Sequence, residues 1–216
     1  MISRPNLDFE IIHDNNKDLC FIGNSFTNET LYRYFKQHRS AEIIRYEDAL
    51  EKNQEWFNNH QFIVTAASVQ FKKMVVNGLS NFSPHYFSVF AQRNRIGFNV
   101  SIGYGSVIDD FNTILDGATI GDHTIVTHHC AISHGVTIGN FCHIGPLTSL
   151  LFTNLGSGCY VGVRSSFIGY ADKPTIVTDY CNFIVGSTVT KSINQAGTYF
   201  NNRCIDNQTS LDRKID

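Results

Sequence analysis

The chain of 216 residues has no excess of charge of either sign and no long hydrophobic run. Its 17 lysine and arginine residues and 19 aspartate and glutamate residues give a formal net charge of -2. The sequence therefore lacks a basic field that would bind nucleic acid or an anionic lipid surface, and we expect neither partner. No stretch approaches the ~18 apolar residues of a membrane span, and the start of the chain carries no apolar core of a secretion signal. We expect a soluble, cytoplasmic protein with no membrane partner.

Paired cysteines are also missing. The six cysteines are scattered along the chain and form no Cys-x-x-Cys motif. Without the dense spacing of a small secreted scaffold, this pattern is typical of reduced and mostly buried thiols.

What the chain does contain is a repeat of branched apolar residues at every sixth position. It runs unbroken through Ile96, Ile102, Ile108, Ile114, Ile120, Val126, Ile132, Ile138, Ile144 and Leu150. A period of six fits neither a helix nor a continuous strand, so we expect short strands joined by regular corners, as in a hexapeptide solenoid. Glycine often follows the apolar residue, where a tight corner needs a small or φ-permissive residue. The register then slips and resumes, which predicts loops, at Leu155, Val161, Phe167, Val177, Phe183 and Val189.

The first ninety residues show a different, alternating β/α pattern. Predicted strands over 19–22, 42–46 and 61–67 alternate with helices that begin near Thr27, Asp48 and Val69. This order is typical of a small parallel sheet with a half-Rossmann outline, whose strand-to-helix turns bind ligands at the carboxyl edge. We therefore predict an α/β half-Rossmann-like domain over 1–90, a parallel β-helix of hexapeptide repeats over 91–193, and a C-terminal cap and tail over 194–216.

Histidines concentrate in one part of the repeat, at positions 123, 128, 129, 134 and 143. If eighteen residues form one three-sided coil, Asp116, His134 and Phe152 stack in one column at the spacing of neighbouring strands. A carboxylate one coil away can orient an imidazole and raise its pKa, as a general base requires. Alternatively, Asp116 is a solvated corner residue. For His123 and His128 we expect ordinary surface positions.

The segment from Ala131 to Pro146 resembles the sugar-nucleotide N-acetyltransferases of the bacillosamine and perosamine type, a branch of the left-handed β-helix acyltransferases. That family has two histidines nine positions apart around a Val-Ile-Gly segment, as His134 and His143 are here. The resemblance implies that His134 is the general base and that His143 contacts acetyl-CoA near its thioester. It further implies that the CoA-binding set includes Gly145, Phe152, Val163 and Val185.

The resemblance extends over nearly the whole chain, because this family begins with a β/α domain that holds the nucleotide of a nucleotide-linked amino sugar. It implies substrate-binding positions at Gly23, Asn24, Ser25, Glu47, Asp48 and Ser68. It also implies homotrimers with active sites between subunits, acetyl-CoA or another acyl-CoA as co-substrate, no metal, and a place in polysaccharide or O-antigen synthesis.

Three departures from the family pattern bear on the substrate. Asn24 to Thr27 replace the Gly-Gly-x-Gly/His turn, so the backbone approaches a pyrophosphate differently. Gly135 replaces the acid beside the catalytic histidine, which leaves Asp116 or the Ser133 hydroxyl to orient His134. Phe152 stands where the family has a glycine near the thioester, which fits a changed acyl group.

Three other functions use the same solenoid. O-acylation would employ the same histidine with a hydroxyl acceptor. A γ-carbonic-anhydrase-like zinc protein would use His129 and His134 as ligands, but Arg93 and Phe98 stand where its third histidine belongs, so no third ligand completes the set. A non-catalytic scaffolding or sugar-nucleotide-sensing protein is the third alternative.

Overall fold

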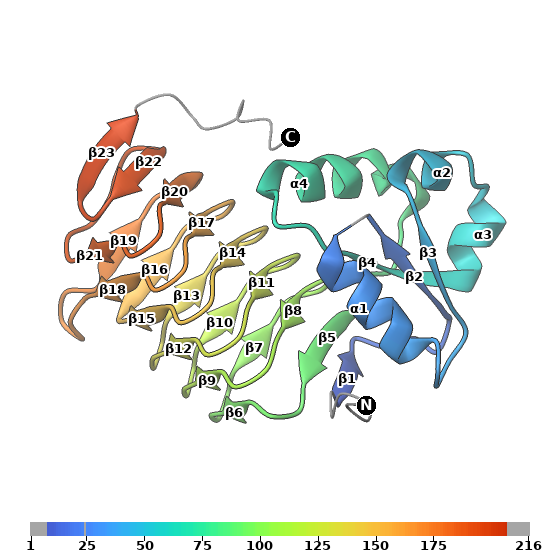
Figure 1. Cartoon of the computed structure of the whole chain (residues 1–216), viewed down its shortest axis with the longest axis horizontal. Helices are drawn as coiled ribbons and strands as arrows, with labels where there is room; N and C mark the ends of the chain where they lie inside the picture. Colours follow the sequence, from blue (N-terminus) through green and yellow to red (C-terminus); the bar gives the residue numbers. More distant parts are fainter. Residues whose placement is uncertain (1–7, 24, 207–216) are drawn as a thin grey trace, which may run out of the picture.

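The computed structural model describes residues 8–23 and 25–206 and shows two packed units, an α/β unit and a three-sided parallel β-helix (Figure 1). The α/β unit has a parallel sheet in the order β3-β2-β4. Its strands are β2 (Asp18–Ile22), β3 (Ala41–Ile44) and β4 (His60–Val64). Its helices are α1 (Phe26–Phe35), α2 (Tyr46–Leu50), α3 (Gln54–Asn59), α4 (Val69–Gly78) and the 3-10 turn η1 (Ser80–Phe82).

The helix caps explain where two of these helices begin. Ser25, and not the Thr27 region expected from the sequence, caps α1, because its side chain accepts a hydrogen bond from Asn28 N. Ser68 caps α4 in the same way by accepting from Phe71 N.

The described residues contain no helix that is long and apolar enough to cross a membrane.

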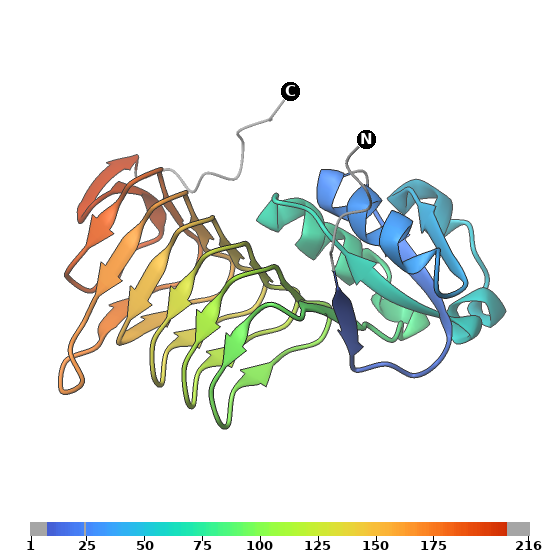
Figure 2. The same ribbon diagram turned by 60° about the horizontal axis from the view of Figure 1, so that its bottom comes forward.

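Three sheets form the β-helix, and the chain visits them in turn (Figure 2). The first sheet contains β1 (Phe9–Ile12), β5 (Ser88–Ala91), β8 (Val107–Ile108), β11 (Ile125–Val126), β14 (His143–Ile144), β17 (Tyr160–Val161), β20 (Cys181–Phe183), β22 (Gly197–Phe200) and β23 (Arg203–Asp206). The second contains β6 (Arg95–Ile96), β9 (Thr113–Ile114), β12 (Ala131–Ile132), β15 (Ser149–Leu151), β18 (Ser166–Ile168) and β21 (Thr188–Val189). The third contains β7 (Ser101–Ile102), β10 (Thr119–Ile120), β13 (Thr137–Ile138), β16 (Thr153–Leu155) and β19 (Thr175–Val177).

We name the three corners of the β-helix by residues that lie on them. The Val163 corner joins the first sheet to the second, the His134 corner joins the second to the third, and the α4 corner joins the third back to the first. All three corners recur in each complete coil. Each predicted site residue of the β-helix lies either on one of these corners or on a strand between two of them.

The interior of the β-helix confirms the predicted repeat. The apolar residues from Ile108 to Leu150, and the slipped positions from Leu155 to Val189, are all buried in one core. Ile96 and Ile102 lie at the open end and are only partly covered. The repeat therefore identified the inward-facing side chains even where the spacing changes.

Of the two reasons expected for the glycines that follow the apolar residues, small size applies and φ freedom does not. Positive φ angles occur elsewhere in the corners, for example at Gly117 and Gly135. A Cβ added at Gly139 would instead lie 2.6 Å from Ser157 N of the next coil. Close approach of successive coils, and not left-handed backbone, requires glycine there.

The α/β unit packs against the outer face of the first sheet. Val107 and Ile125, which point outward from β8 and β11, share a core with Phe21, Ile63 and Leu31 of the α/β unit. The strand β1 lies before this unit in the sequence but pairs with β5 of the β-helix. The α/β unit therefore covers the outer face of the first sheet at β8 and β11.

Candidate active site

His134 lies at the His134 corner, in the turn between β12 and β13, and its side chain is exposed. Among the described residues, no hydrogen bond engages its imidazole. An exposed, unpaired imidazole on a rigid corner can accept a proton from a group brought to it from outside the chain.

Asp116 lies one coil below His134, but its carboxylate has another partner. Its Oδ1 accepts a hydrogen bond of 2.8 Å from Phe98 N, in the coil below. The same arrangement recurs at the α4 corner, where Asp122 accepts from Tyr104 N. Asp116 therefore acts in this chain as a corner residue that ties successive coils together, which is the alternative that the sequence left open.

The Ser133 hydroxyl does not orient His134 either. Ser133 is half-buried, and within the described chain its hydroxyl makes no hydrogen bond to the imidazole. Neither predicted orienting group contacts His134 in a single subunit.

Phe152 does not stack on His134, contrary to the predicted column. The pairing of β12 with β15 has an offset of 18 residues, as between Ile132 and Leu150. The pairing of β13 with β16 has an offset of only 17, as between Ile138 and Leu155. The corner above His134 is thus one residue shorter, and Phe152, with φ of 45°, occupies the left-handed position that Gly135 holds in the coil below.

His143 points outward from the first sheet, in the row that continues from Ile125. Its ring stacks on Tyr160 of the next coil, with centroids 5.1 Å apart. Its Nδ1 is buried and has no partner among the described residues. Burial, and secondarily the charge of Lys72, lowers the pKa of His143 to about 4, so the ring is neutral at pH 7.

Three of the other predicted CoA residues lie together on the Val163 corner, whereas Phe152 lies on the His134 corner. Gly145, Val163 and Val185 occupy equivalent turns after β14, β17 and β20. Val185 is 64% exposed, whereas Gly145 is buried against the coil above it. The structure thus gathers these three residues at one corner and places His134 at the next, on the far side of the second sheet.

The pair His129 and His134 does not form a metal site within one chain. His129 lies on the Val163 corner, where its ring stacks on Phe111 with centroids 5.0 Å apart. Among residues 8–23 and 25–206, no group of three histidine, cysteine or acidic side chains could hold a metal ion.

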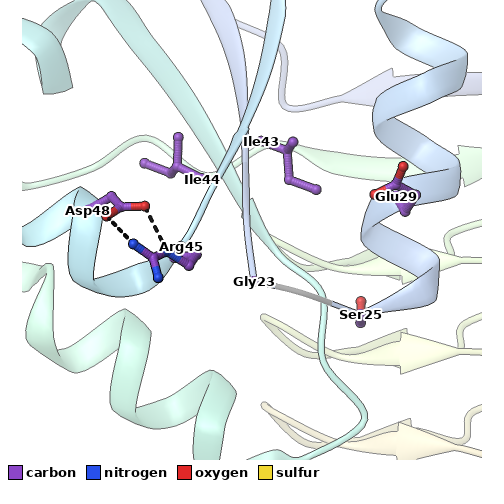
Figure 3. A pocket seen from close by; sticks show the side chains of 7 residues that line it. All are labelled: Gly23, Ser25, Glu29, Ile43, Ile44, Arg45 and Asp48. Atoms are coloured by element: carbon purple, nitrogen blue, oxygen red, sulfur yellow. Dashed lines mark hydrogen bonds and ion pairs between the residues drawn. The ribbon is translucent and has the colours of Figure 1, made fainter.

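A cavity of about 580 Å³ opens at the carboxyl edge of the α/β sheet (Figure 3). It is lined by Gly23, Ser25, Glu29, Ile43, Ile44, Arg45 and Asp48. The Arg45 guanidinium donates to both carboxylate oxygens of Asp48 at 3.0 Å. This hydrogen bond lowers the pKa of Asp48, which keeps the pair ionised.

Three of the predicted substrate-binding residues line this cavity, namely Gly23, Ser25 and Asp48. Glu47 and Ser68 are not among its lining residues, and Ser68 serves as the cap of α4. The prediction for Asn24 lies outside the described residues. The sequence prediction missed four lining residues: the apolar Ile43 and Ile44, Arg45 and Glu29. It assigned Arg45 to the interior of a strand extending to Tyr46 and treated Glu29 as a helix-start signal.

A polar network holds the first turn without the usual glycine cluster. Ser25 Oγ donates to Thr65 O at 2.5 Å, Thr65 Oγ1 donates to Asn28 Oδ1 at 2.7 Å, and Asn28 Nδ2 donates to Gly23 O at 2.9 Å. Asn28 and Thr65 are buried. A buried, satisfied network of this kind fixes one backbone path, here the path around the cavity mouth.

No protein-family model and no curated protein sequence matches the chain. Several solved structures match over nearly its whole length. The acetyltransferase domain of PglB from Neisseria gonorrhoeae FA1090, in complex with acetyl coenzyme A, is 15% identical, with a TM-score of 0.74 over 89% of this chain and 100% of that one.

Two further structures are similar. WeeI from Acinetobacter baumannii AYE is 17% identical, with a TM-score of 0.75 over 88% of this chain and 99% of that one. PerB from Caulobacter crescentus, in complex with CoA and GDP-perosamine, is 14% identical, with a TM-score of 0.73 over 84% and 92%. The chain therefore has the fold of these proteins, an N-terminal α/β unit followed by a left-handed parallel β-helix.

Proposed function

We propose that this protein transfers an acyl group, in the simplest case acetyl, from acyl-CoA to the amine of a nucleotide-linked amino-deoxysugar. The observation that carries the proposal is the exposed, unpaired imidazole of His134 on a β-helix corner, in a chain that also has a cavity at the carboxyl edge of an α/β sheet. The same two-part fold occurs in the PglB domain solved with acetyl coenzyme A and in PerB solved with CoA and GDP-perosamine.

The chemistry assigned to His134 is general base catalysis. The sugar amine attacks the thioester carbonyl carbon, a C–N bond forms, and the C–S bond breaks as the thiolate leaves. His134 takes the proton from the attacking nitrogen, and that proton then passes to the sulfur, so the products are an amide and free CoA. Backbone N–H groups of the corner would stabilise the oxyanion.

We further propose a homotrimer with the acyl-CoA held between subunits. In support, three of the residues assigned to CoA, Gly145, Val163 and Val185, lie on the Val163 corner, while His134 lies on the next corner of the same chain. An acyl-CoA bound along the Val163 corner of one subunit would meet the His134 corner of its neighbour. As part of the same proposal, the sequence resemblance supports a cytoplasmic enzyme that supplies an acylated amino sugar for polysaccharide or O-antigen synthesis.

The nucleotide is assigned to the cavity beside Gly23 and Arg45. Its position at the carboxyl edge of β2 and β3 is the ligand position of α/β sheets. The Arg45 guanidinium is a planar cation that suits a phosphate or a carbonyl oxygen. It would bind the ligand while it remains hydrogen-bonded to Asp48.

The test is release of free thiol from acetyl-CoA in the presence of dTDP-, UDP- and GDP-linked amino sugars, with hydroxyl-only sugar nucleotides as a comparison. We expect release with at least one amino sugar, and its loss in His134→Ala. His38→Ala, an exposed histidine after α1, is the matched control and should retain full activity. Thiol release that survives His134→Ala, or that occurs only with hydroxyl acceptors, would contradict the proposal.

A further inference from the structure

Lys72 is fully buried although it carries an ionisable amine. Its Nζ donates to two backbone carbonyls, His123 O at 2.9 Å and Cys142 O at 3.0 Å. These carbonyls belong to successive turns of the α4 corner, which lead into β11 and β14. Lys72 thus connects helix α4 of the α/β unit to two coils of the β-helix at once.

This arrangement is costly because no carboxylate within the described chain pairs with the Lys72 amine. Burial lowers its pKa to about 7. Burial, and then the charge of Lys72, lowers the pKa of both His123 and His143 to about 4, so neither ring supplies a negative charge. The Cys142 thiol, which donates to Gly156 O of the next coil at 3.1 Å, raises the Lys72 pKa, but by less than burial lowers it. A buried amine without a carboxylate partner weakens the fold relative to an apolar side chain of similar size.

The position of Lys72 relates it to the proposed site. Val107 and Ile125 are covered by the core of the α/β unit, and His143 is the next residue of that outward row. The Lys72 Nζ donates a hydrogen bond to the carbonyl of Cys142, the residue immediately before His143. The contact therefore lies beside His143, the first of the proposed acyl-CoA residues along the chain.

Two other residues of α4 also contact the β-helix. Val69 lies against Gly158, and Lys73 hydrogen-bonds to Tyr180, one and two coils further on. The Lys73 ammonium also lies 4.8 Å from the centroid of the Tyr180 ring. The α4 corner thus carries an apolar and an exposed polar contact in addition to the buried amine.

We propose that Lys72 is a positioning residue that fixes the α/β unit, and with it the nucleotide cavity, relative to His143. This inference rests on the proposed acyl transfer. A bound amino sugar must meet the thioester within a fraction of an ångström, and a displacement of about 1 Å can cost roughly 100-fold in rate. The two carbonyl contacts of Lys72 set that alignment, at the expense of stability.

The test compares Lys72→Met with Lys73→Met, a neighbouring lysine on the same helix. For Lys72→Met we expect kcat to fall by about 10-fold or more, while KM for both co-substrates changes by less than about 3-fold. Its Tm should stay the same or rise, because a buried unpaired amine is removed. Lys72→Arg, which keeps the cation and its donors, should recover part of the kcat, and Lys73→Met should keep nearly all of it.

A purely structural role makes the opposite prediction, since Lys72→Met would then lower Tm and weaken ligand binding together with kcat. That result, or an unchanged kcat, would overturn the inference. Amide hydrogen exchange provides a readout that does not depend on turnover: α4 should exchange faster in Lys72→Met but not in Lys73→Met. If the wild-type protein transfers no acyl group, the proposed function fails, and the role of Lys72 in catalysis fails with it. If exchange in α4 is unchanged in Lys72→Met, the hydrogen bonds of Lys72 do not fix the position of α4, whatever the activity.

Discussion

The imidazole of His143 lies nearly parallel to the ring of Tyr160, with an angle of 5° between their planes. The two rings belong to neighbouring strands of successive coils, β14 and β17. His143 is therefore fixed by a neighbour that is itself 37% exposed. This dependence leads to the first prediction.

Replacing Tyr160 with alanine should release His143. Because an aromatic pair contributes about 0.5–1.5 kcal/mol, we expect KM for acetyl-CoA to rise by about 3- to 10-fold, with a smaller change in kcat. The His143 pKa should rise from about 4 toward 6.5, because the ring loses part of its cover. NMR titration of the histidine ring protons and steady-state kinetics measure both. Tyr160→Phe, which keeps the stack, is the control and should behave as the wild type.

The surface position predicted for His123 is wrong, because its side chain is buried in the turn before β11. Stability should fall in mild acid, since the ring is buried in its neutral form. Its pKa is lowered from 6.5 to about 4, chiefly by burial, so the unfolded chain binds the proton more tightly than the folded one. The contribution of His123 is complete above pH 6.5 and is lost as the pH falls through 4. Urea unfolding across this range should show a shallower pH slope for His123→Asn, which tolerates the left-handed backbone at this position. An identical slope would show that other groups control acid stability.

The lowered pKa of Lys72 predicts that the free energy of unfolding rises as the pH increases above 7. Its pKa is lowered from 10.5 to about 7, so the folded protein binds fewer protons than the unfolded chain between these values. Below pH 7 the buried ammonium lowers the free energy of unfolding by its whole amount, on the order of 5 kcal/mol. This loss disappears by pH 10.5. Denaturation at pH 7, 8 and 9 should show this rise in the wild type and in Lys73→Met. The rise should be absent in Lys72→Met.

Arg45 should determine nucleotide binding without affecting the acyl donor. Removing the guanidinium in Arg45→Met takes away a hydrogen bond between charged groups worth about 1.5–3 kcal/mol, so KM for the sugar nucleotide should rise by about 10- to 100-fold. KM for acetyl-CoA should not change, because the cavity lies on the α/β unit. Glu47→Gln, on the same short helix as Asp48 but outside the lining set, is the control. Equal effects of the two variants would show that the cavity is not the nucleotide site.

Gly139 should tolerate no side chain. A Cβ at this position would lie 2.6 Å from Ser157 N, so Gly139→Ala must push two coils apart and should cost about 1–3 kcal/mol. Thr137→Ala changes an exposed side chain of the same coil and should cost less than about 1 kcal/mol. Chemical denaturation of both variants measures the difference. A cost for Gly139→Ala no greater than that for Thr137→Ala would mean that the coils can separate freely.

The sequence predicted the interior of the β-helix well because the inward positions obey one physical rule. Each must be apolar, so Val177 and Phe183 were found even after the spacing had changed. The same rule does not determine the number of residues in a corner. The missing residue between Leu150 and Leu155 was visible as a shorter interval, yet its effect on the Phe152 column required the strand pairing to be known.

Side-chain direction was the other limit of the sequence. Spacing correctly placed Asp116 one coil below His134, but the nearest free backbone donor, Phe98 N, lies below and not above it. In the α/β unit, Arg45 was missed because β3 ends at Ile44, two residues before the end expected for the strand. Buried contacts such as that of Lys72 depend on the packing of two units and leave no local pattern in the sequence.

The pairing of β1 with β5 has a consequence for how the chain is made. Phe9 pairs with Ala91 and Ile12 with Ser88, so the whole α/β unit is inserted between two neighbouring strands of a single sheet. During synthesis β1 must wait for a partner that emerges roughly eighty residues later, and such long-range pairing folds slowly. A truncation that starts at β2 would leave the β5 edge bare, with unpaired N–H and C=O groups that favour aggregation. β1 is thus made first but pairs last, and its pairing covers the β5 edge from which the coils begin.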